Sequence, residues 1–394
     1  MGKFNAQMFS WLRLSFSSRW IRTQYSRPTI MSGGFYEKVI RRLPPTNPKY
    51  DPNGYIAADY NYIEHLENGG RHKEMNDAFT NQVQLVATPL KGWNITAEFN
   101  SRINSDWTHQ DSMPVYAHDA DDLEGLSSET THLAFDSGEH SSIYEYAFRQ
   151  TYLNLNLFTD YSFTIADKNE FKVMLGFQTE AWNNRDLNAS RDDMVVEEIP
   201  VIEQTSSTQT YNIGGIIRKW RTAGFFGRIN YNFEGRYLFE ANLRYDASSR
   251  FRREHRWIWS PSFSAGWNVA NEKFWEPIAS WWNHLKLRAS WGQLSNQNTE
   301  KLYPTYRILE VKNNNSSWLV NGLKPATAKF PPLVNPYLTW EKIQTTNIGI
   351  DFGFFNNRLY GSFDYFWRTN RDMIGEPRVF PAVLGAEVPK ENRL

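Results

Sequence analysis

Residues 225–246 read FFGRINYNFEGRYLFEANLRYD, two alternating segments separated by Glu234-Gly235-Arg236. The apolar members of the segment 225–233 are Phe225, Ile229, Tyr231 and Phe233. Those of the segment 237–246 are Tyr237, Phe239, Ala241, Leu243 and Tyr245. Mostly Asn, Arg, Glu and Asp occupy the positions between them. Strict alternation with a period of two is the signature of a β-strand, so the stretch predicts two antiparallel strands joined by a tight turn.

The same alternation recurs along the chain. It is clear over 171–178, 285–292, 348–354 and 359–368, and weaker over 9–22, 81–89, 93–103, 149–166 and 257–269. Pro261 lies inside the last of these segments and indicates an edge, a bulge or a rim position, because proline cannot donate to the ladder. The pattern predicts about 11 strands.

The predicted connections alternate in length. Short turns fall at 89–92, 167–170, 234–236 and 356–358, whereas long loops fall at about 105–143, 183–220 and 293–341. A moderate loop at 247–256 and an intermediate segment at 270–283 complete the series. Outer-membrane barrels place short turns on the periplasmic rim and long loops on the extracellular rim. A soluble β-sandwich has no reason to sort its loops in this way. We therefore predict an all-β fold, a transmembrane antiparallel β-barrel.

The composition of the two strand faces supports this fold. The polar face is rich in Asn, Arg, Glu and Gly, which suits a wide wet lumen. The apolar face often ends in an aromatic residue, which suits the aromatic belts at a membrane interface: Trp93, Tyr231, Tyr237, Tyr245, Trp291 and Trp367. Alternation alone also fits a soluble barrel with its apolar face inward. An open sheet leaves unpaired backbone groups in lipid, so about 11 strands would form only part of a barrel.

The overall composition excludes several classes of protein. The 394 residues carry 43 Lys and Arg against 43 Asp and Glu, and this balance argues against a nucleic-acid-binding protein. There is no cysteine, and hence no disulfide, thiolate metal site or cysteine nucleophile. Aromatic residues make up 16%, yet no window approaches the length of a transmembrane helix. Residues 1–21 lack the pattern of an export signal, so we expect the natural N-terminus to lie upstream.

Several blocks of the sequence resemble the SusC/RagA-type TonB-linked outer-membrane proteins. The blocks are 47–54, 227–251, 259–268, 285–298, 335–342 and 347–354, and the resemblance covers most of residues 40–394. It implies a barrel of roughly 22 strands preceded by an export signal, a TonB box and a plug domain. None of these last three is visible, so we expect residues 1–394 to form a partial barrel domain without a plug.

The resemblance also implies a function. It predicts part of an active importer of oligosaccharides or peptides in the bacterial outer membrane. A SusD-like surface lipoprotein would cap the barrel, and TonB would energise it through the missing N-terminal region. The resemblance implies no enzyme activity and no cofactor. Three alternatives remain open at this point: a passive porin-like barrel, an outer-membrane barrel enzyme and a soluble all-β carbohydrate-binding protein.

Few residues suggest a particular site. The acidic stretch 118–124 has ligands suited to calcium but lacks the EF-hand spacing, so we interpret it as a solvated loop. Trp281 and Trp282 fall on the short-turn side and predict interface anchors. Trp318 falls in a long loop, where an ordinary loop aromatic is favoured over a ligand or lid contact. Dispersed carboxylates and the absence of HExxH or GxSxG motifs predict no catalytic or metal site, and the substrate-binding residues stay unassigned.

Overall fold

The computed structural model describes residues 1–31, 33–42, 46, 50, 54, 63–118, 131–133, 139–206, 211–312, 318–329, 331–375, 377, 383 and 388–393. Twelve strands form one antiparallel sheet. In sheet order they are β1 (Gly2–Phe9), β2 (Leu12–Pro28), β3 (Arg71–Leu90), β4 (Trp93–Ser112), β7 (Ser142–Ile165), β8 (Asn169–Asp192), β9 (Tyr211–Phe233), β10 (Tyr237–Ser248), β11 (Trp257–Asn268), β12 (Trp282–Asn296), β15 (Glu341–Phe354) and β16 (Leu359–Arg371).

Smaller elements lie in the connections. Three two-stranded ribbons pair β5 (Tyr116–His118) with β6 (Thr131–Leu133), β13 (Glu310–Lys312) with β14 (Thr327–Lys329), and β17 (Met373–Gly375) with β18 (Glu391–Arg393). Two short helices, α1 (Gly33–Arg42) and α2 (Ile63–Asn68), follow β2. No helix in the described part of the chain is long and apolar enough to cross a membrane.

All the predicted strands are present, but two features of the prediction were wrong. The segment 9–22 contains a turn at Ser10-Trp11, so that β1 precedes it as a strand that was not predicted. Among the described residues, parts of the predicted loops 105–143 and 183–220 are strand, because β4, β8 and β9 continue well past the alternating segments and β7 begins before its own. In these extensions polar residues occupy both faces. The backbone ladder persists although the apolar alternation ends.

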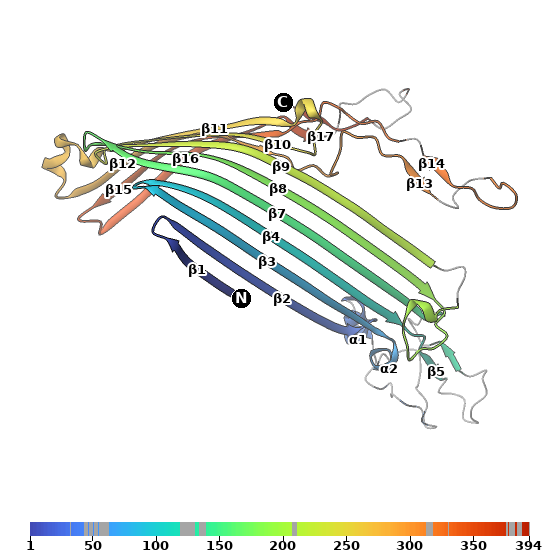
Figure 1. Cartoon of the computed structure of the whole chain (residues 1–394). Helices are drawn as coiled ribbons and strands as arrows, with labels where there is room; N and C mark the ends of the chain where they lie inside the picture. The colour runs from blue at the N-terminus through green and yellow to red at the C-terminus, as the bar shows by residue number, and fades with distance from the viewer. Residues whose placement is uncertain are drawn as a thin grey trace.

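The sorting of connections by length is confirmed. All the tight turns lie at one end of the sheet and the loops at the other (Figure 1). Two short 3-10 helices, η3 (Val269–Asn271) and η4 (Lys273–Ile278), form the connection between β11 and β12 at the turn end. The turn between β9 and β10 places Glu234 and Gly235 at φ of 48° and 66°, the left-handed conformation that tight hairpins require.

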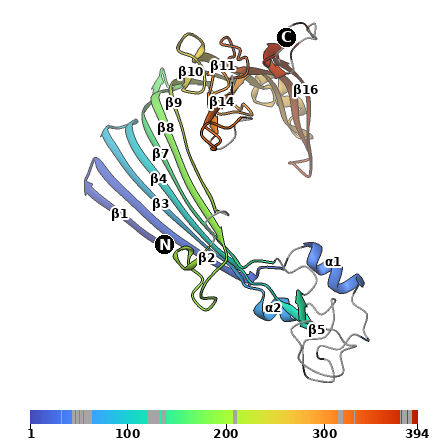
Figure 2. The same ribbon diagram turned by 90° about the vertical axis from the view of Figure 1, so that its right-hand side faces the viewer.

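The sheet is open and curved. Figure 2 shows it as an arc that runs from β1 to β16, with a convex and a concave side. Within the described residues, β1 pairs only with β2 and β16 only with β15. Register pairing keeps each row of side chains on one side across all neighbouring strands, as in the row Asn100, Asn154, Glu180 and Thr222.

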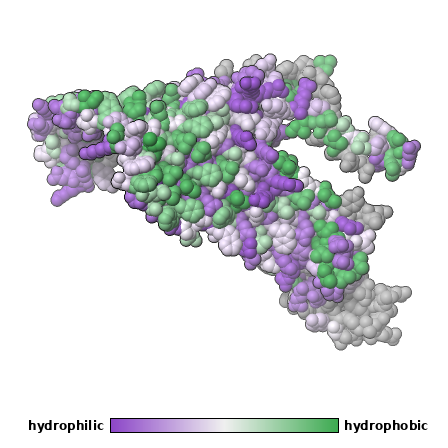
Figure 3. All heavy atoms as spheres, viewed as in Figure 1, coloured by the Kyte–Doolittle hydropathy of each residue, from purple (hydrophilic) through white to green (hydrophobic). Residues whose placement is uncertain are grey.

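The convex side is apolar and exposed. Hydrophobic residues gather over the central part of this face, whereas hydrophilic residues are frequent at the turn end and toward the loops (Figure 3). The side chains of Leu175, Phe225 and Phe363 are 61%, 53% and 63% exposed, respectively. A water-soluble barrel would turn these side chains inward, whereas a transmembrane barrel turns them to lipid.

The height of the apolar face fits a membrane. On β7 it extends from Tyr161 to Thr151, ten residues along the strand. At about 3.3 Å per residue and a tilt of about 40°, this corresponds to a band about 25 Å tall. Rings contact one another across strands at its turn-side limit, where Phe163–Phe171 and Phe171–Tyr231 centroids lie 5.3 and 4.8 Å apart.

A second aromatic cluster marks the loop-side limit. Tyr245 stacks between Trp257 and Trp259, with centroid distances of 4.6 and 4.2 Å. All three side chains project from the convex face of β10 and β11. The aromatic ends of the strands therefore form two belts, as the sequence predicts.

Candidate functional site: the concave wall of the sheet

The concave side carries a network of uncharged polar and acidic side chains. Across β4 and β7, the Asn100 amide donates to Asn154 Oδ1 at 3.3 Å and to Glu98 Oε1 at 2.8 Å. Farther along the same row, the Thr222 hydroxyl donates to Glu180 Oε2 at 3.3 Å. Each contact joins residues of one face on the same or neighbouring strands. The wall can therefore present rigid hydrogen-bonding groups to a solute in the lumen.

A second part of this network crosses β9 and β10. Arg228 Nε donates to Asn242 Oδ1 at 2.6 Å, and the Asn242 amide donates to Glu240 Oε1 at 2.7 Å. The Asn230 amide donates to Glu240 Oε2 at 3.1 Å. These residues pair directly in register, so the alternation read from 225–246 places all of them on the lumen side.

An arginine joins three strands farther along the sheet. Arg288 on β12 forms two 2.8 Å bonds to Asp351 on β15 and reaches Asp364 on β16 at 3.2 Å. Gly349 lies between Arg288 and Asp364 in the row, and a Cβ there would come within 3.0 Å of the guanidinium. Because Gly349 has no side chain, the Arg288 guanidinium can extend across β15 and reach Asp364 on β16.

A shallow concavity of about 660 Å³ lies along the wall nearer the turn end. Cationic and anionic groups share its lining, which includes Lys172, Lys286, Arg288, Glu170 and Glu240. With both signs of charge and several amides present, the concavity suits a neutral, hydrogen-bonding solute better than a strongly charged one.

Two tryptophans stand on the same wall nearer the loops. Trp182 on β8 and Trp220 on β9 pair directly in register and stack at a centroid distance of 6.1 Å with planes 18° apart. The Arg250 guanidinium lies 5.5 Å from the Trp220 ring centre. Tyr152 lies opposite Trp182 in the same row on β7. We name Tyr152, Trp182 and Trp220 the aromatic row.

The sequence prediction missed the aromatic row. Trp182 and Trp220 border the segment 183–220 that was predicted as a loop, so they were not placed on any face. One signal was present: both have even numbers, like the polar positions of 171–178 and 225–233. Extending that parity would have placed both on the lumen side.

The predicted loop tryptophans have different surroundings. Trp281 and Trp282 lie at the turn end, as predicted, and Trp282 packs against Trp275 and Phe354 at centroid distances of 4.9 and 5.1 Å. Trp318 is 62% exposed near the β13–β14 ribbon, and its role stays a prediction. Residues 119–124 of the acidic stretch lie outside the described residues. Within the described part of the chain, no cluster of His, Asp or Glu could hold a metal ion.

A compact core at the loop end joins two of the blocks that carry the resemblance. Phe251, which is fully buried, packs against Trp340 at a centroid distance of 5.4 Å, with Ile258 completing the cluster. The Trp340 indole donates to the Arg256 carbonyl oxygen at 2.8 Å. The loop after β10 is thereby fixed to the segment that enters β15.

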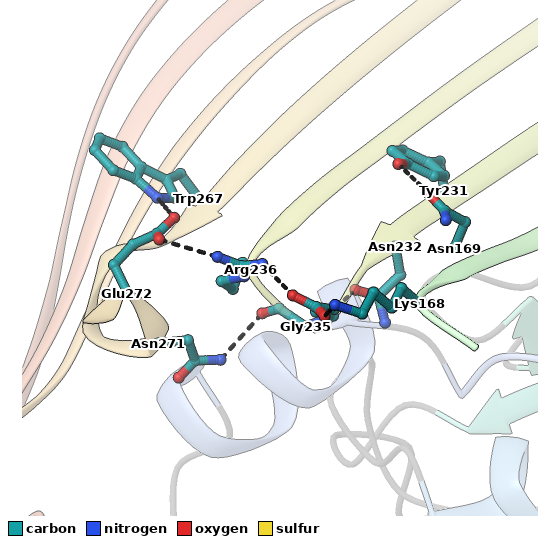
Figure 4. A network of polar contacts seen from close by, with 10 residues as sticks. Lys168, Asn169, Tyr231, Asn232, Gly235, Arg236, Trp267, Asn271 and Glu272 are labelled. Atoms are coloured by element: carbon teal, nitrogen blue, oxygen red, sulfur yellow. Dashed lines mark hydrogen bonds and ion pairs between the residues drawn. The ribbon is translucent and has the colours of Figure 1, made fainter. Parts of the chain in front are cut away.

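At the opposite end a polar network ties three turns together (Figure 4). Glu234 accepts from Lys168 Nζ at 2.8 Å and from Arg236, and Arg236 Nη1 lies 3.3 Å from Glu272 Oε2. The Trp267 indole donates to Glu272 Oε1 at 3.1 Å. The turns β7–β8, β9–β10 and β11–β12 are thus linked through side chains as well as through the sheet.

We expect this turn network to loosen in acid. The Lys168 ammonium and then Arg236 lower the pKa of Glu234, and hydrogen bonds from Tyr237, Trp267 and Arg236 lower the pKa of Glu272. A carboxylate with a lowered pKa stabilises the folded state above its unfolded pKa, and this contribution is lost as the pH falls through the lower, folded-state value. The loss should therefore begin below the ordinary value of 4.5.

The measurement is hydrogen exchange of the Gly235 and Arg236 amides, corrected for the intrinsic effect of pH. Their protection should fall in acid in the unmodified chain. Glu272→Gln removes one of the titrating groups and should flatten that profile. Identical profiles for the two proteins would show that the network does not hold the turns.

Comparison with known proteins identifies the family. A family model described as TonB dependent receptor-like, beta-barrel, matches residues 25–386. The chain belongs to this family. The TonB-dependent receptor SusC of Bacteroides thetaiotaomicron is 28% identical over 246 residues, which cover 61% of this chain and 23% of SusC. The TonB-dependent receptor P26 of Formosa agariphila is 30% identical over 173 residues, covering 44% of this chain and 16% of P26.

Solved structures support the same fold. The RagAB peptide importer in its open-open state matches with a TM-score of 0.78 at 20% identity, over 99% of this chain and 41% of the importer chain. The TonB-dependent receptor chain therefore has the predicted all-β architecture of an outer-membrane barrel, and its location is the bacterial outer membrane. It spans about a quarter or less of the length of the curated relatives it matches.

Proposed function

We propose that this TonB-dependent receptor chain forms part of the wall of an active importer of oligosaccharides or peptides. The observation that carries the proposal is the concave face, where hydrogen-bonded amides and carboxylates adjoin the aromatic row. Amides and carboxylates bind the hydroxyl or peptide groups of a neutral polymer, and the indole faces bind its apolar surfaces. Such a wall guides a solute without forming or breaking a covalent bond.

The proposal includes the partners of the family. A SusD-like surface lipoprotein would cap the loop end, and TonB would supply energy through an N-terminal region. Further strands would pair with the free edges of β1 and β16, because lipid does not tolerate unpaired edges. In this arrangement the Phe251–Trp340 core would hold two loops in a fixed position beneath the lipoprotein.

The experiment measures uptake of labelled oligosaccharides and peptides by cells that carry the protein. Trp182→Ala with Trp220→Ala should lower the uptake of one substrate class about tenfold, which corresponds to stacking of about 0.5–1.5 kcal/mol for each ring. Trp281→Ala is the control, because Trp281 lies at the turn end outside the concave wall. Equal uptake by the double variant and the unmodified protein would contradict the role of the aromatic row.

A second arm separates active import from a passive pore. Collapse of the proton gradient with an uncoupler should abolish uptake if TonB energises the protein. Uptake that continues at the same rate would replace the proposal with a passive porin-like barrel. This result would leave the membrane placement of the strands intact, since that rests on the exposed convex face.

A further inference from the structure

Four basic side chains stand together on the convex face at the loop-side limit of the apolar band. They are Arg149 on β7, Arg185 on β8, and Lys219 and Arg221 on β9, and all four are exposed. Arg149 pairs directly with Arg185 in register, and Lys219 and Arg221 pair with Asn183 and Ala181 of β8. We call these four residues the basic patch.

The basic patch lacks acidic partners among the described residues. Asp77, the nearest acid on this face toward β2, is held by two 2.8 Å bonds from Arg22. Glu145, four residues from Arg149 along β7, lies 2.6 Å from His109 Nδ1. Asp186 faces the lumen and pairs with Arg218 at 3.4 Å. Like charges directly opposite each other destabilise a strand pair unless an anion lies between them.

The patch lies at the level of lipid headgroups. Arg149 is 12 residues from Tyr161 of the turn-side belt, and Arg221 is 10 residues from Tyr231 of the same belt. With a rise of about 3.3 Å and a tilt of about 40°, the patch lies about 25–30 Å from that belt. The apolar band itself is about 25 Å tall, so the patch begins where the hydrocarbon ends.

Below the patch the same strands present a surface for acyl chains. Leu153 and Leu157 on β7 and Phe225 on β9 are 38%, 42% and 53% exposed on the convex face. A ligand that binds the patch from the membrane therefore needs an anionic head and long apolar tails. The basic patch lies on the loop side of the apolar band. In an outer-membrane barrel the long loops are extracellular, so the patch faces the outer leaflet.

We propose that the basic patch is a binding site for the phosphate groups of an anionic lipid in the outer leaflet. Arginine forks form bidentate hydrogen bonds to phosphate, and Arg149 and Arg185 are placed to share one phosphate between them. The phosphate removes the repulsion of the two guanidinium groups. Bound lipid would thus stabilise the sheet at the height where β7, β8 and β9 leave the membrane. The inference rests on membrane placement and is independent of what the protein transports.

The test compares two lipids that differ only in phosphate. The full chain is folded in detergent micelles, its strand content is verified by circular dichroism, and bisphosphorylated or dephosphorylated lipid A is titrated and followed by native mass spectrometry. The unmodified chain should prefer the phosphorylated form. Arg149→Gln with Arg185→Gln should weaken binding of that form about thirtyfold, as expected for two charges at a membrane surface.

Matched controls separate binding from folding. Arg19→Gln with Arg102→Gln removes the same charge from the concave face, in a row three residues nearer the turn end, and should leave lipid binding unchanged. Without lipid, the Arg149/Arg185 variant should melt at the same or a higher temperature than the unmodified chain, because a repulsion is removed. Inorganic phosphate at the same concentration should not compete, since it lacks the tails.

Three outcomes would overturn the proposal. The first is equal binding of both lipid forms by the folded, unmodified chain. The second is an equal loss of binding in the concave-face control, which would indicate a general effect of net charge. The third is full competition by inorganic phosphate, which would assign the patch to a free anion and not to a lipid.

Discussion

Leu175→Arg should destabilise the membrane-inserted sheet by about 2–4 kcal/mol, whereas the same substitution at the neighbouring Met174 should cost less than about 0.5 kcal/mol. Leu175 projects from the convex face of β8 and is 61% exposed, near the middle of the apolar band. An arginine there must lose its hydration within lipid. Met174 lies on the concave side, in the row of Asp160 and Arg228. An arginine at this position stays hydrated and lies beside the Asp160 carboxylate.

The measurement is urea unfolding of each variant, carried in the barrel closed by the further strands, after folding into phosphatidylcholine vesicles, followed by tryptophan fluorescence. The two adjacent substitutions are matched in charge and in strand position. The difference between their free energies of unfolding therefore depends on which face of the sheet carries the new arginine. Equal costs at the two positions, or a larger cost at Met174, would contradict the assignment of the convex face to lipid.

Phe251→Ala should cost about 3–5 kcal/mol at the loop end, the usual loss for a large buried aromatic side chain. Phe251 has no exposed surface, and its ring packs on Trp340 and Ile258. Its removal leaves a cavity between the loop after β10 and the segment before β15. Thr339, whose hydroxyl donates to the His255 carbonyl oxygen at 3.1 Å, should lose that contact as the two segments separate.

The loss of stability in the Phe251→Ala variant is measured by the rate of protease cleavage within 249–256 and by the urea midpoint of unfolding in lipid. Phe274→Ala is the control, because Phe274 is 63% exposed at the turn end and should change either value little. A cleavage rate for the Phe251 variant equal to that of the control would show that the cluster does not hold the loops.

The lipid-facing strands could be predicted from sequence because lipid imposes a rule on them. On β9 and β10 the apolar face must meet hydrocarbon and the polar face must meet water, so most residues alternate over 228–233 and 239–246. Pro261 was expected at an edge, a bulge or a rim. It lies at a local edge, since the pairing of β11 with β12 begins only at Ser262, whereas Pro261 still pairs with Leu243 of β10.

Beyond the membrane the rule no longer applies. The loop-side ends of β8 and β9 are wetted on both faces, so polar residues occupy odd and even positions alike. Their ladder is held by backbone hydrogen bonds, which leave no mark on the pattern of side chains. The Ser10-Trp11 turn was missed for a related reason, because its only turn-favouring residue is Ser10, a weaker marker than the Gly, Asn, Asp or Pro that it lacks.

The concave site could be predicted only in outline. The polar face of each strand was recognised, but the partners of Arg288 depend on the register between β12, β15 and β16. Register is set by long-range pairing and cannot be read from one segment. The contact of Trp182 with Trp220 likewise could not be predicted from a local pattern. The two residues are 38 positions apart in the sequence, and only the register between β8 and β9 places them opposite each other.

A cysteine scan along β8 tests the central claim most directly. The chain has no cysteine, so single substitutions over 170–181 report one position each. Each variant, carried in the barrel closed by the further strands, is folded into vesicles, then labelled with a small fluorophore and exposed to a nitroxide lipid or to a water-soluble quencher. We expect the lipid to quench the odd positions and the aqueous reagent to quench the even ones. Quenching without alternation, or with lipid at the even positions, would contradict the placement of these strands in a membrane barrel.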